Sequence, residues 1–401
     1  MFRAAITPPG MATLVVITAL SVLTQNMILP SLPTIASEFG VSYGVANLMV
    51  AGYLAIMGVL LIPIGPLSDR FGRRPVMIWS TVLFIIASVG CALAENIWVL
   101  LGFRLLQAAS VGGQVVSRAA LRDMYEPKEA ASRLGWVTMA MALAPMLGPM
   151  VGGALEVGFG WRASFWLYAI LGCLSLWMVY ADFAETNKYP AATFGAQLRL
   201  YPALFTSRRF WGYALCMAFA VGGFFIFITG APLVAQAWFD LSPAALGLGI
   251  GIITGGFMIG NLVTGLTAQR VKLIKLILIG RVFSITGPLI GLTLFATGLG
   301  SLWVFFGSAI LLGFGNGLTM ANATAGMLAA RPDLAGSAAG LSGAVGVAIG
   351  AVLTFATGVL VTPEAAPFTV LGAMLLAGVL AMASALWVMW VDLHDPLPAS
   401  V

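Results

Sequence analysis

The chain has 401 residues, of which 60% are hydrophobic and 8% are charged, and its formal net charge is +5. Soluble domains carry about 25% charged residues, so this composition excludes an ordinary soluble protein and predicts an all-α integral membrane protein. The chain has a single histidine, His394, and three cysteines that form no CxxC pair. We therefore expect no metal site, no cofactor and no histidine-based catalytic site.

Taken in chain order, the apolar segments predict twelve transmembrane helices. Each is close to the roughly 20 residues that a helix needs to cross a bilayer. A polar segment separates the first six from the last six, which predicts a six-helix half at 1–182, a cytoplasmic linker at 183–209 and a second half at 210–401. The expected spans are 11–31, 44–64, 75–94, 97–117, 134–155, 161–181, 211–232, 245–266, 274–297, 300–324, 337–360 and 367–391.

The lysines and arginines of the short loops predict the orientation of these spans. With the N-terminus inside, nearly all of them fall on the cytoplasmic side, and only Arg162 stands at an outer boundary. Arg281 then falls in the cytoplasmic third of the ninth span. We expect both termini in the cytoplasm, and we attribute the net positive charge to the loops rather than to nucleic-acid binding.

Charge is concentrated between the second and third spans, in "GPLSDRFGRRPV" at residues 65–76, which we call the charged loop. Its pattern is G-x-x-x-D-R-x-G-R-R. Gly65 would allow two helices to approach closely, and Gly72 would permit a tight turn. Asp69 would pair with a nearby arginine or face the start of the eleventh span at 335–340. A purely topological role would explain the arginines but neither the aspartate nor the glycine spacing.

A degraded copy of the charged loop, "GLTAQRVKLIKL", begins at Gly265, 200 residues after Gly65. Gln269 stands in it at the position of Asp69, while the basic character is kept. Two six-span halves with corresponding loops predict a transporter built from two repeats.

Two further motifs lie inside spans. The fifth span contains "GPMVGG" at 148–153, where proline removes a backbone donor and glycines thin the helix. Ordinary packing of small residues is the alternative interpretation of this motif. The fourth span contains Arg104 and Gln107. A charge at this depth is costly and usually functional, although an arginine that snorkels outward is the alternative.

These motifs resemble those of the major facilitator superfamily, and the six-plus-six plan of that superfamily covers the whole chain. Three stretches, "LPSLPTIASEFG" (29–40), "SRAALRD" (117–123) and "RPDLAGSAAG" (331–340), are similar to the Bcr/CflA group of bacterial drug:proton antiporters. The resemblance implies the major facilitator fold, a latch between the two halves in the charged loop, and an antiporter motif in the fifth span. The latch would comprise Gly65, Asp69, Arg70, Gly72, Arg73 and Arg74, and the antiporter motif Gly148, Pro149, Gly152 and Gly153.

The chain departs from the Bcr/CflA pattern in its first span, where Asn26 stands in place of the expected aspartate. Proton coupling needs a carboxylate that can gain and lose a proton near ambient pH. Every acidic residue of this chain lies at a span end or in a loop, and Glu156 is the best remaining candidate. The candidates for substrate binding or coupling are Gln25, Asn26, Arg104, Gln107, Gln114, Glu156, Phe224, Phe225, Asn316 and Asn322.

The sequence thus predicts a monomeric secondary transporter, not an enzyme, in the inner membrane of a bacterium. Its partners would be the lipid bilayer, a small molecule and protons, and it would export amphipathic compounds or drugs by proton antiport with alternating access. The alternative is a metabolite or soft-metal transporter of the same fold with weak or no proton coupling, because Met146 and Met150 share a helix face and thioethers bind Cu(I). No motif identifies the substrate, and a nucleophile–base pair that would indicate an enzyme is not found.

Overall fold

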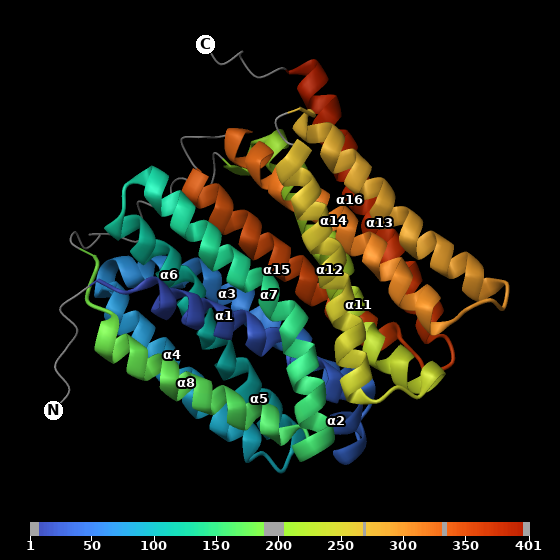
Figure 1. Cartoon of the computed structure of the whole chain (residues 1–401), viewed down its shortest axis with the longest axis horizontal. Helices are drawn as coiled ribbons and strands as arrows, with labels where there is room; N and C mark the ends of the chain where they lie inside the picture. The colour runs from blue at the N-terminus through green and yellow to red at the C-terminus, as the bar shows by residue number, and fades with distance from the viewer. Residues whose placement is uncertain (1–7, 188–203, 268–269, 331–334, 396–401) are drawn as a thin grey trace. The chain divides into compact units, whose positions relative to one another are not determined.

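The computed structural model describes residues 8–187, 204–267, 270–330 and 335–395 (Figure 1). The described residues form helices and connecting turns, and they contain no strand. The helices are α1 (Met11–Asn26), η1 (Leu29–Ser31), α2 (Leu32–Glu38), α3 (Tyr43–Phe71), α4 (Arg73–Ala92), α5 (Ile97–Gln107), η2 (Ala108–Ser110), α6 (Val111–Met124), α7 (Pro127–Phe159), α8 (Arg162–Asp182), α11 (Arg208–Phe239), α12 (Pro243–Thr267), α13 (Leu273–Ala296), α14 (Leu302–Ala330), α15 (Ala335–Leu360) and α16 (Ala366–His394).

The predicted number of spans is confirmed. Eleven helical stretches of the described chain are long and apolar enough to cross a membrane, and the apolar stretch Leu143–Phe159 at the end of α7 supplies the remaining helix. Several helices extend beyond the expected spans because their polar ends continue past the hydrophobic segment. The second span, for example, was expected to end at residue 64, whereas α3 continues to Phe71.

The first and fourth spans are interrupted, which the hydropathy pattern did not predict. In the first span α1 ends at Asn26, a short 3-10 helix follows, and α2 continues to Glu38. The cause lies in the sequence "LPSLP", because Pro30 and Pro33 have no N–H to donate to the preceding turn. The fourth span changes from α5 through the 3-10 turn η2 to α6, so that it runs from Ile97 to Met124.

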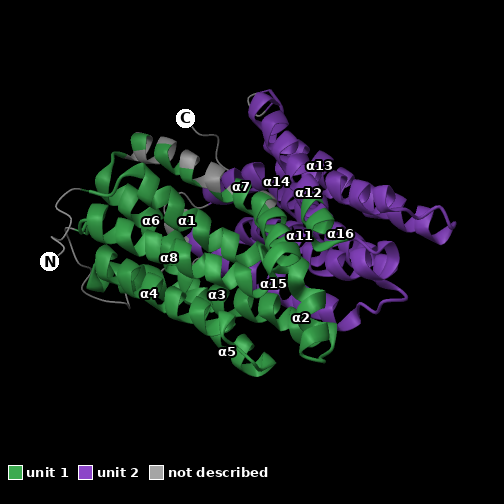
Figure 2. Ribbon diagram, turned by 60° about the horizontal axis from the view of Figure 1, so that its bottom comes forward, with its two compact units in different colours: residues 1–194, 242–248 green, residues 195–241, 249–401 purple. Residues whose placement is uncertain are grey.

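The helices form two compact units, drawn in different colours in Figure 2. Unit 1 comprises residues 1–194 and 242–248, and unit 2 comprises residues 195–241 and 249–401. In unit 1, α4 packs against α5 and α8, and α1 packs against α7. In unit 2, α13 packs against α14 and α16, while α11 packs against α15 and α16. Residues 188–203 of the expected linker and Gln269 of the expected loop copy lie outside the described residues.

Glycines bring helix backbones into direct contact in unit 2. A Cβ on Gly315 of α14 would overlap the carbonyl oxygen of Gly280 on α13. A Cβ on Gly256 of α12 would lie 3.2 Å from the backbone nitrogen of Phe314 on α14. Small residues permit such close approach in a membrane, where packing replaces the hydrophobic effect between helices.

Side chains at the ends of the first and sixth spans join one end of unit 1. Glu38, at the end of α2, accepts hydrogen bonds from Trp161 Nε1 at 2.6 Å and from Arg162 Nη1 at 2.6 Å. Arg162 Nη2 also donates to the carbonyl oxygen of Ala94 at 3.2 Å, and its guanidinium lies over the Trp161 ring. The charge of Arg162, which the sequence placed alone at an outer boundary, is therefore paired.

The backbone contact in unit 2 predicts a position-specific effect of adding one methyl group. Gly315→Ala should lower the stability of the purified protein by about 1–3 kcal/mol, because the new Cβ meets backbone that cannot rotate away. Gly307→Ala on the same helix is the matched control, since nothing lies within 4 Å of its Cβ position. Thermal unfolding in detergent measures both, and equal melting temperatures for the two variants would contradict the packing described.

Candidate functional site

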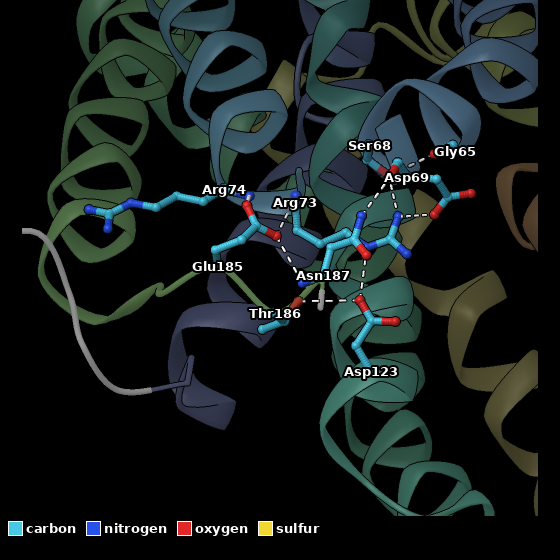
Figure 3. A network of polar contacts seen from close by, with 9 residues as sticks. All are labelled: Gly65, Ser68, Asp69, Arg73, Arg74, Asp123, Glu185, Thr186 and Asn187. Atoms are coloured by element: carbon cyan, nitrogen blue, oxygen red, sulfur yellow. Dashed lines mark hydrogen bonds and ion pairs between the residues drawn. The ribbon is translucent and has the colours of Figure 1, made fainter. Parts of the chain in front are cut away.

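The charged loop makes a tight turn at Gly72, whose φ of 98° is a value that favours glycine. Arg73 begins α4 immediately after this turn. Its buried guanidinium forms ion pairs or hydrogen bonds with three side chains of unit 1 (Figure 3). Arg73 forms an ion pair with Asp69 one turn earlier, and its Nε lies 2.9 Å from Asp123 Oδ2. Arg73 Nη1 also donates to Ser68 Oγ at 2.6 Å. The loop is thus a hydrogen-bonded junction between the ends of α3, α4 and α6.

The segment that follows α8 closes this junction. Glu185 Oε1 and Oε2 accept the backbone N–H groups of Arg73 and Arg74 at 2.9 and 3.1 Å, which caps the N-terminus of α4 (Figure 3). Thr186 Oγ1 donates to Asp123 Oδ2 at 3.3 Å, and Asn187 Nδ2 donates to the Asp69 carbonyl at 2.7 Å. Sequence reasoning missed these three residues because it assigned them to the linker. The available signal was that α4 starts after a glycine and so needs a cap from elsewhere.

The other residues of the charged loop have more local partners. Arg74 Nη2 donates to the carbonyl of Tyr180 at 3.2 Å, and the Arg70 guanidinium lies 5.4 Å from the centre of the Phe71 ring. A Cβ on Gly65 would come no nearer than 4.0 Å to Val115, so the structure gives no close approach that requires glycine there. All the described contacts lie within unit 1. The latch between halves stays a prediction, and the side chains at 335–337, which it would face, lie outside the described residues.

Arg104, on α5, is buried in unit 1. Its side chain is 0% exposed, so it does not snorkel to the membrane surface. Its Nε donates to Met49 O at 3.0 Å, its Nη2 to Thr24 O at 2.8 Å, and its Nη1 to Gln107 Oε1 at 2.5 Å. Gln107 Nε2 then donates to Ser88 Oγ at 2.7 Å. We call these five residues the Arg104 network; they connect the first four spans.

Two tyrosines extend the Arg104 network. The guanidinium lies 4.4 Å from the centre of the Tyr53 ring, and Tyr53 Oη shares a 2.8 Å hydrogen bond with Ser110 Oγ. Tyr168 of α8 donates to the Thr24 carbonyl at 3.2 Å. Thr24 belongs to the last turn of α1, where carbonyls have no helical donor. The interruption of the first span therefore supplies the acceptor that Arg104 and Tyr168 share.

Unit 2 contains a second buried guanidinium, that of Arg281 on α13, which is 1% exposed. Its Nε donates to Thr319 Oγ1, and its Nη2 donates to Gly315 O and Asn316 Oδ1, each at 2.9 Å. Asn316 Nδ2 donates in turn to Ala220 O at 2.9 Å. From the sequence, Arg281 was interpreted only as a marker of topology, although an arginine inside a span is itself a signal of a special site.

The antiporter motif packs on the interruption of the first span. A Cβ on Gly152 would overlap the carbonyl oxygen of Met27, the residue after α1. A Cβ on Gly148, one turn earlier, would lie 3.3 Å from the Cβ of Asn26. Pro149 and Gly153 are buried beside them in the same helix. Glycine is thus required where α7 meets the irregular backbone at Asn26 and Met27.

The remaining candidates of unit 1 carry incompletely satisfied polar groups. Asn26 Nδ2 donates to Val22 O at 2.9 Å, whereas Asn26 Oδ1, Gln114 Nε2 and Glu156 Oε2 are buried without a hydrogen-bond partner. Gln25 is engaged differently, because its Nε2 lies 3.2 Å from Met57 Sδ. Among the candidate residues of unit 1, these three atoms are the ones left with hydrogen-bonding capacity for a ligand.

In unit 2 the side-chain amides of the candidate residues already form hydrogen bonds with other groups of the protein. Asn316 uses both ends of its amide, as described above, and Asn322 Nδ2 donates to Leu318 O at 2.7 Å. Phe224 and Phe225 lie with ring centres 5.9 Å apart, and Phe225 lies against Gly350 of α15.

The turn of the charged loop predicts a strong effect of a small substitution. Gly72→Ala should destabilise the protein by about 1–3 kcal/mol, because alanine is strained at this φ and its Cβ would overlap the Glu185 carboxylate. Gly102→Ala on α5 is the control, since no atom lies within 4 Å of its Cβ position and alanine favours a helix. The melting temperature should fall for the first variant only; a fall of equal size for both would refute the role of the turn.

The Arg104 network predicts that charge alone cannot replace the arginine. Arg104→Lys keeps the charge but has one nitrogen, which cannot reach three acceptors on different sides, so stability should fall by roughly 3 kcal/mol or more. Arg133→Lys is the control, because Arg133 forms a partly exposed ion pair with Glu129, and this substitution should change the stability little. Thermal unfolding in detergent measures the melting temperatures of both variants and of the parent. An Arg104→Lys protein as stable as the parent but inactive in transport would show that the arginine acts on the substrate instead.

Comparison with known proteins shows which family has this sequence pattern and this fold. The model of the Major Facilitator Superfamily matches residues 14–355. An uncharacterized MFS-type transporter of Bacillus subtilis, YdgK, is 33% identical over 59% of this chain and 61% of its own length. A chloramphenicol resistance protein of Pseudomonas aeruginosa is 32% identical over 60% of this chain and 58% of its own. The matched region thus spans about three fifths of these two relatives.

A longer match is found with Multidrug resistance protein D of Escherichia coli, which is 25% identical over 82% of this chain and 83% of that protein. A bacterial homologue of the human lysosomal transporter Spinster has a TM-score of 0.74 at 17% identity and covers 97% of this chain and 98% of its own. The human organic anion transporter MFSD10 has a TM-score of 0.69 at 17% sequence identity. The match covers 94% of this chain and 98% of that transporter. The two structures show the fold, and the family model covers most of the sequence, so the chain belongs to the Major Facilitator Superfamily, a family of transporters rather than enzymes.

Proposed function

We propose that this protein is a secondary transporter that exports uncharged amphipathic compounds by proton antiport with alternating access, as in the Bcr/CflA group. The observation that carries the proposal is the contact of Gly148 and Gly152 with the interruption of the first span at Asn26 and Met27. Interrupted helices are where transporters of repeated architecture place their substrate and ion sites. The antiporter motif would therefore act directly on the backbone beside that site.

The names of the relatives support drug export. One relative is a chloramphenicol resistance protein, and others are Multidrug resistance protein D and Multidrug resistance protein MdtL. Chloramphenicol carries no net charge at neutral pH, so it is a suitable representative of the proposed substrate class.

The distribution of charge supports an uncharged substrate. Every acidic residue in the described helices lies in the first or last turn, so a cation deeper in the membrane than these helix ends would find no carboxylate beside it. The two buried arginines already donate to protein acceptors, Arg104 in unit 1 and Arg281 in unit 2. Each guanidinium uses three hydrogen bonds on these acceptors, so an anion would compete with acceptors that the protein already supplies.

Glu156 is the residue that we propose as the proton carrier. It lies on α7 one turn after Gly152, and its Oε2 atom is buried without a hydrogen-bond partner. A carboxyl group at this position can take up and release a proton, which an amide or a hydroxyl does not do in the physiological range. Asn26, at the position of the expected aspartate, cannot perform this role because an amide does not titrate in the physiological range.

The localisation that accompanies this function is the inner membrane of a bacterium, with both termini in the cytoplasm and one chain as the working unit. The basic loop residues support this orientation, because positively charged loops are retained on the cytoplasmic side.

Transport by the purified protein in liposomes tests the proposal. An imposed pH gradient should drive chloramphenicol transport by the parent, and excess unlabelled uncharged drug should compete, whereas the permanent cation tetraphenylphosphonium should not. Glu156→Gln should reduce gradient-driven transport at least tenfold while counterflow, which needs no net proton movement, stays within about twofold.

Glu95→Gln, at an exposed glutamate outside the described helices, is the matched control and should behave as the parent. Parent transport that ignores the pH gradient would reject antiport. Strong competition by the cation would reject the substrate class, and full gradient-driven activity of Glu156→Gln would reject that residue as the carrier.

A further inference from the structure

A small cavity lies inside unit 1 that the proposed function does not use. Its volume of about 20 Å³ exceeds the roughly 10–15 Å³ that one water molecule needs. All of its lining residues are buried, and five of them carry hydroxyl groups. The lining residues are Ile17, Leu20, Ser21, Ser80, Thr81, Phe84, Ser110, Gly113 and Ser175.

One hydroxyl of this cavity is unsatisfied. Ser175 is 1% exposed, and its Oγ has no hydrogen-bond partner in the protein. Leaving such a group without a partner costs about 1–3 kcal/mol. Other hydroxyls of the wall keep acceptor capacity, because Thr81 Oγ1 donates to Met77 O at 2.8 Å and Ser21 Oγ donates to Ser110 O.

We propose that this cavity binds one ordered water molecule that hydrogen-bonds Ser175 of α8, Ser80 of α4 and Ser21 of α1. The water accepts from the Ser175 and Ser80 hydroxyls and donates to the free lone pairs of Ser21 and Thr81. This gives it the two to four polar partners that buried waters have in proteins. The proposal rests on the cavity and the unpartnered hydroxyl, and it does not depend on the proposed transport activity.

Water fits this site better than a metal cation does. The lining residues include no carboxylate, and their polar side chains are all neutral hydroxyls. Ser110 in the wall is hydrogen-bonded to Tyr53, whose ring lies against the positive guanidinium of Arg104. That charge disfavours a second cation close by, whereas it leaves a neutral water unaffected.

The water would extend the Arg104 network. Through Ser110 and Tyr53 the cavity adjoins the residues that hold the first four spans, and Ser175 adds the sixth span, α8, to this set. A helix in lipid gains stability from such polar contacts between spans. The water is therefore a structural part of unit 1 that joins α8 to the spans around Arg104.

A double-mutant cycle on the full-length protein in detergent tests the proposal. Ser175→Ala and Ser80→Ala should each lower the melting temperature by about 2 °C, because each removes a partner of the water. The double variant should fall by less than the sum, because the first substitution already releases the water. Ser164→Ala is the matched control, since Ser164 is another buried, unpartnered hydroxyl on α8 that does not line the cavity.

If the cavity is dry, Ser175→Ala will match Ser164→Ala, with an unchanged or higher melting temperature, and the two serines will not couple. That result overturns the proposal. An experimental structure near 2 Å resolution gives an independent answer even where a variant does not fold, because density for one water within 3.2 Å of Ser175 Oγ is required. Stabilisation of the parent by NaCl relative to choline chloride, abolished by Ser175→Ala, would overturn it in favour of a sodium ion.

Discussion

The Arg104 guanidinium lies fully buried among helices that cross the membrane, where bulk water is not available to its N–H groups. Such a group is tolerated only if the protein supplies the acceptors. Unit 1 supplies them from three directions, as the carbonyls of Thr24 and Met49 and the amide oxygen of Gln107. The acceptor at Thr24 lies in the last turn of α1, just before the chain leaves the helix at Asn26. An interruption that would be a defect in an isolated helix is thereby part of how the unit holds a charge.

The same interruption connects the Arg104 network with the proposed function. Gly148 and Gly152 allow α7 to approach it, and the unpartnered oxygens of Asn26 and Glu156 belong to the helices that meet there. Unit 2 satisfies a buried arginine in another way, through Thr319, Asn316 and the Gly315 carbonyl on one neighbouring helix. Both arginines already donate three hydrogen bonds to protein acceptors, which is why we infer a substrate without charge.

Hydropathy was sufficient to predict twelve helices, because the bilayer requires long apolar segments with internally satisfied backbone. It did not predict the interruptions at Asn26 and Gln107, since the residues on either side are as apolar as the helices themselves. The motif at 65–76 led to the turn at Gly72 and to the pairing of Asp69 with Arg73. Glu185 could not be found this way, because a cap supplied from a segment more than 100 residues distant depends on tertiary structure.

Arg104 and Arg281 show the limit of reasoning about a single residue. Sequence and depth identified Arg104 as special, but only its partners distinguish a residue that holds helices together from one that binds a ligand. Arg281 was assigned to topology because its span is basic at the cytoplasmic end, yet its hydrogen bonds are as complete as those of Arg104.

The most direct measurement is an experimental structure of the protein with chloramphenicol bound. We expect the Arg104 guanidinium to keep its hydrogen bonds to Thr24 O, Met49 O and Gln107 Oε1 and to make no contact with the drug. A drug atom hydrogen-bonded to Arg104, with the bond to Thr24 O broken, would contradict it.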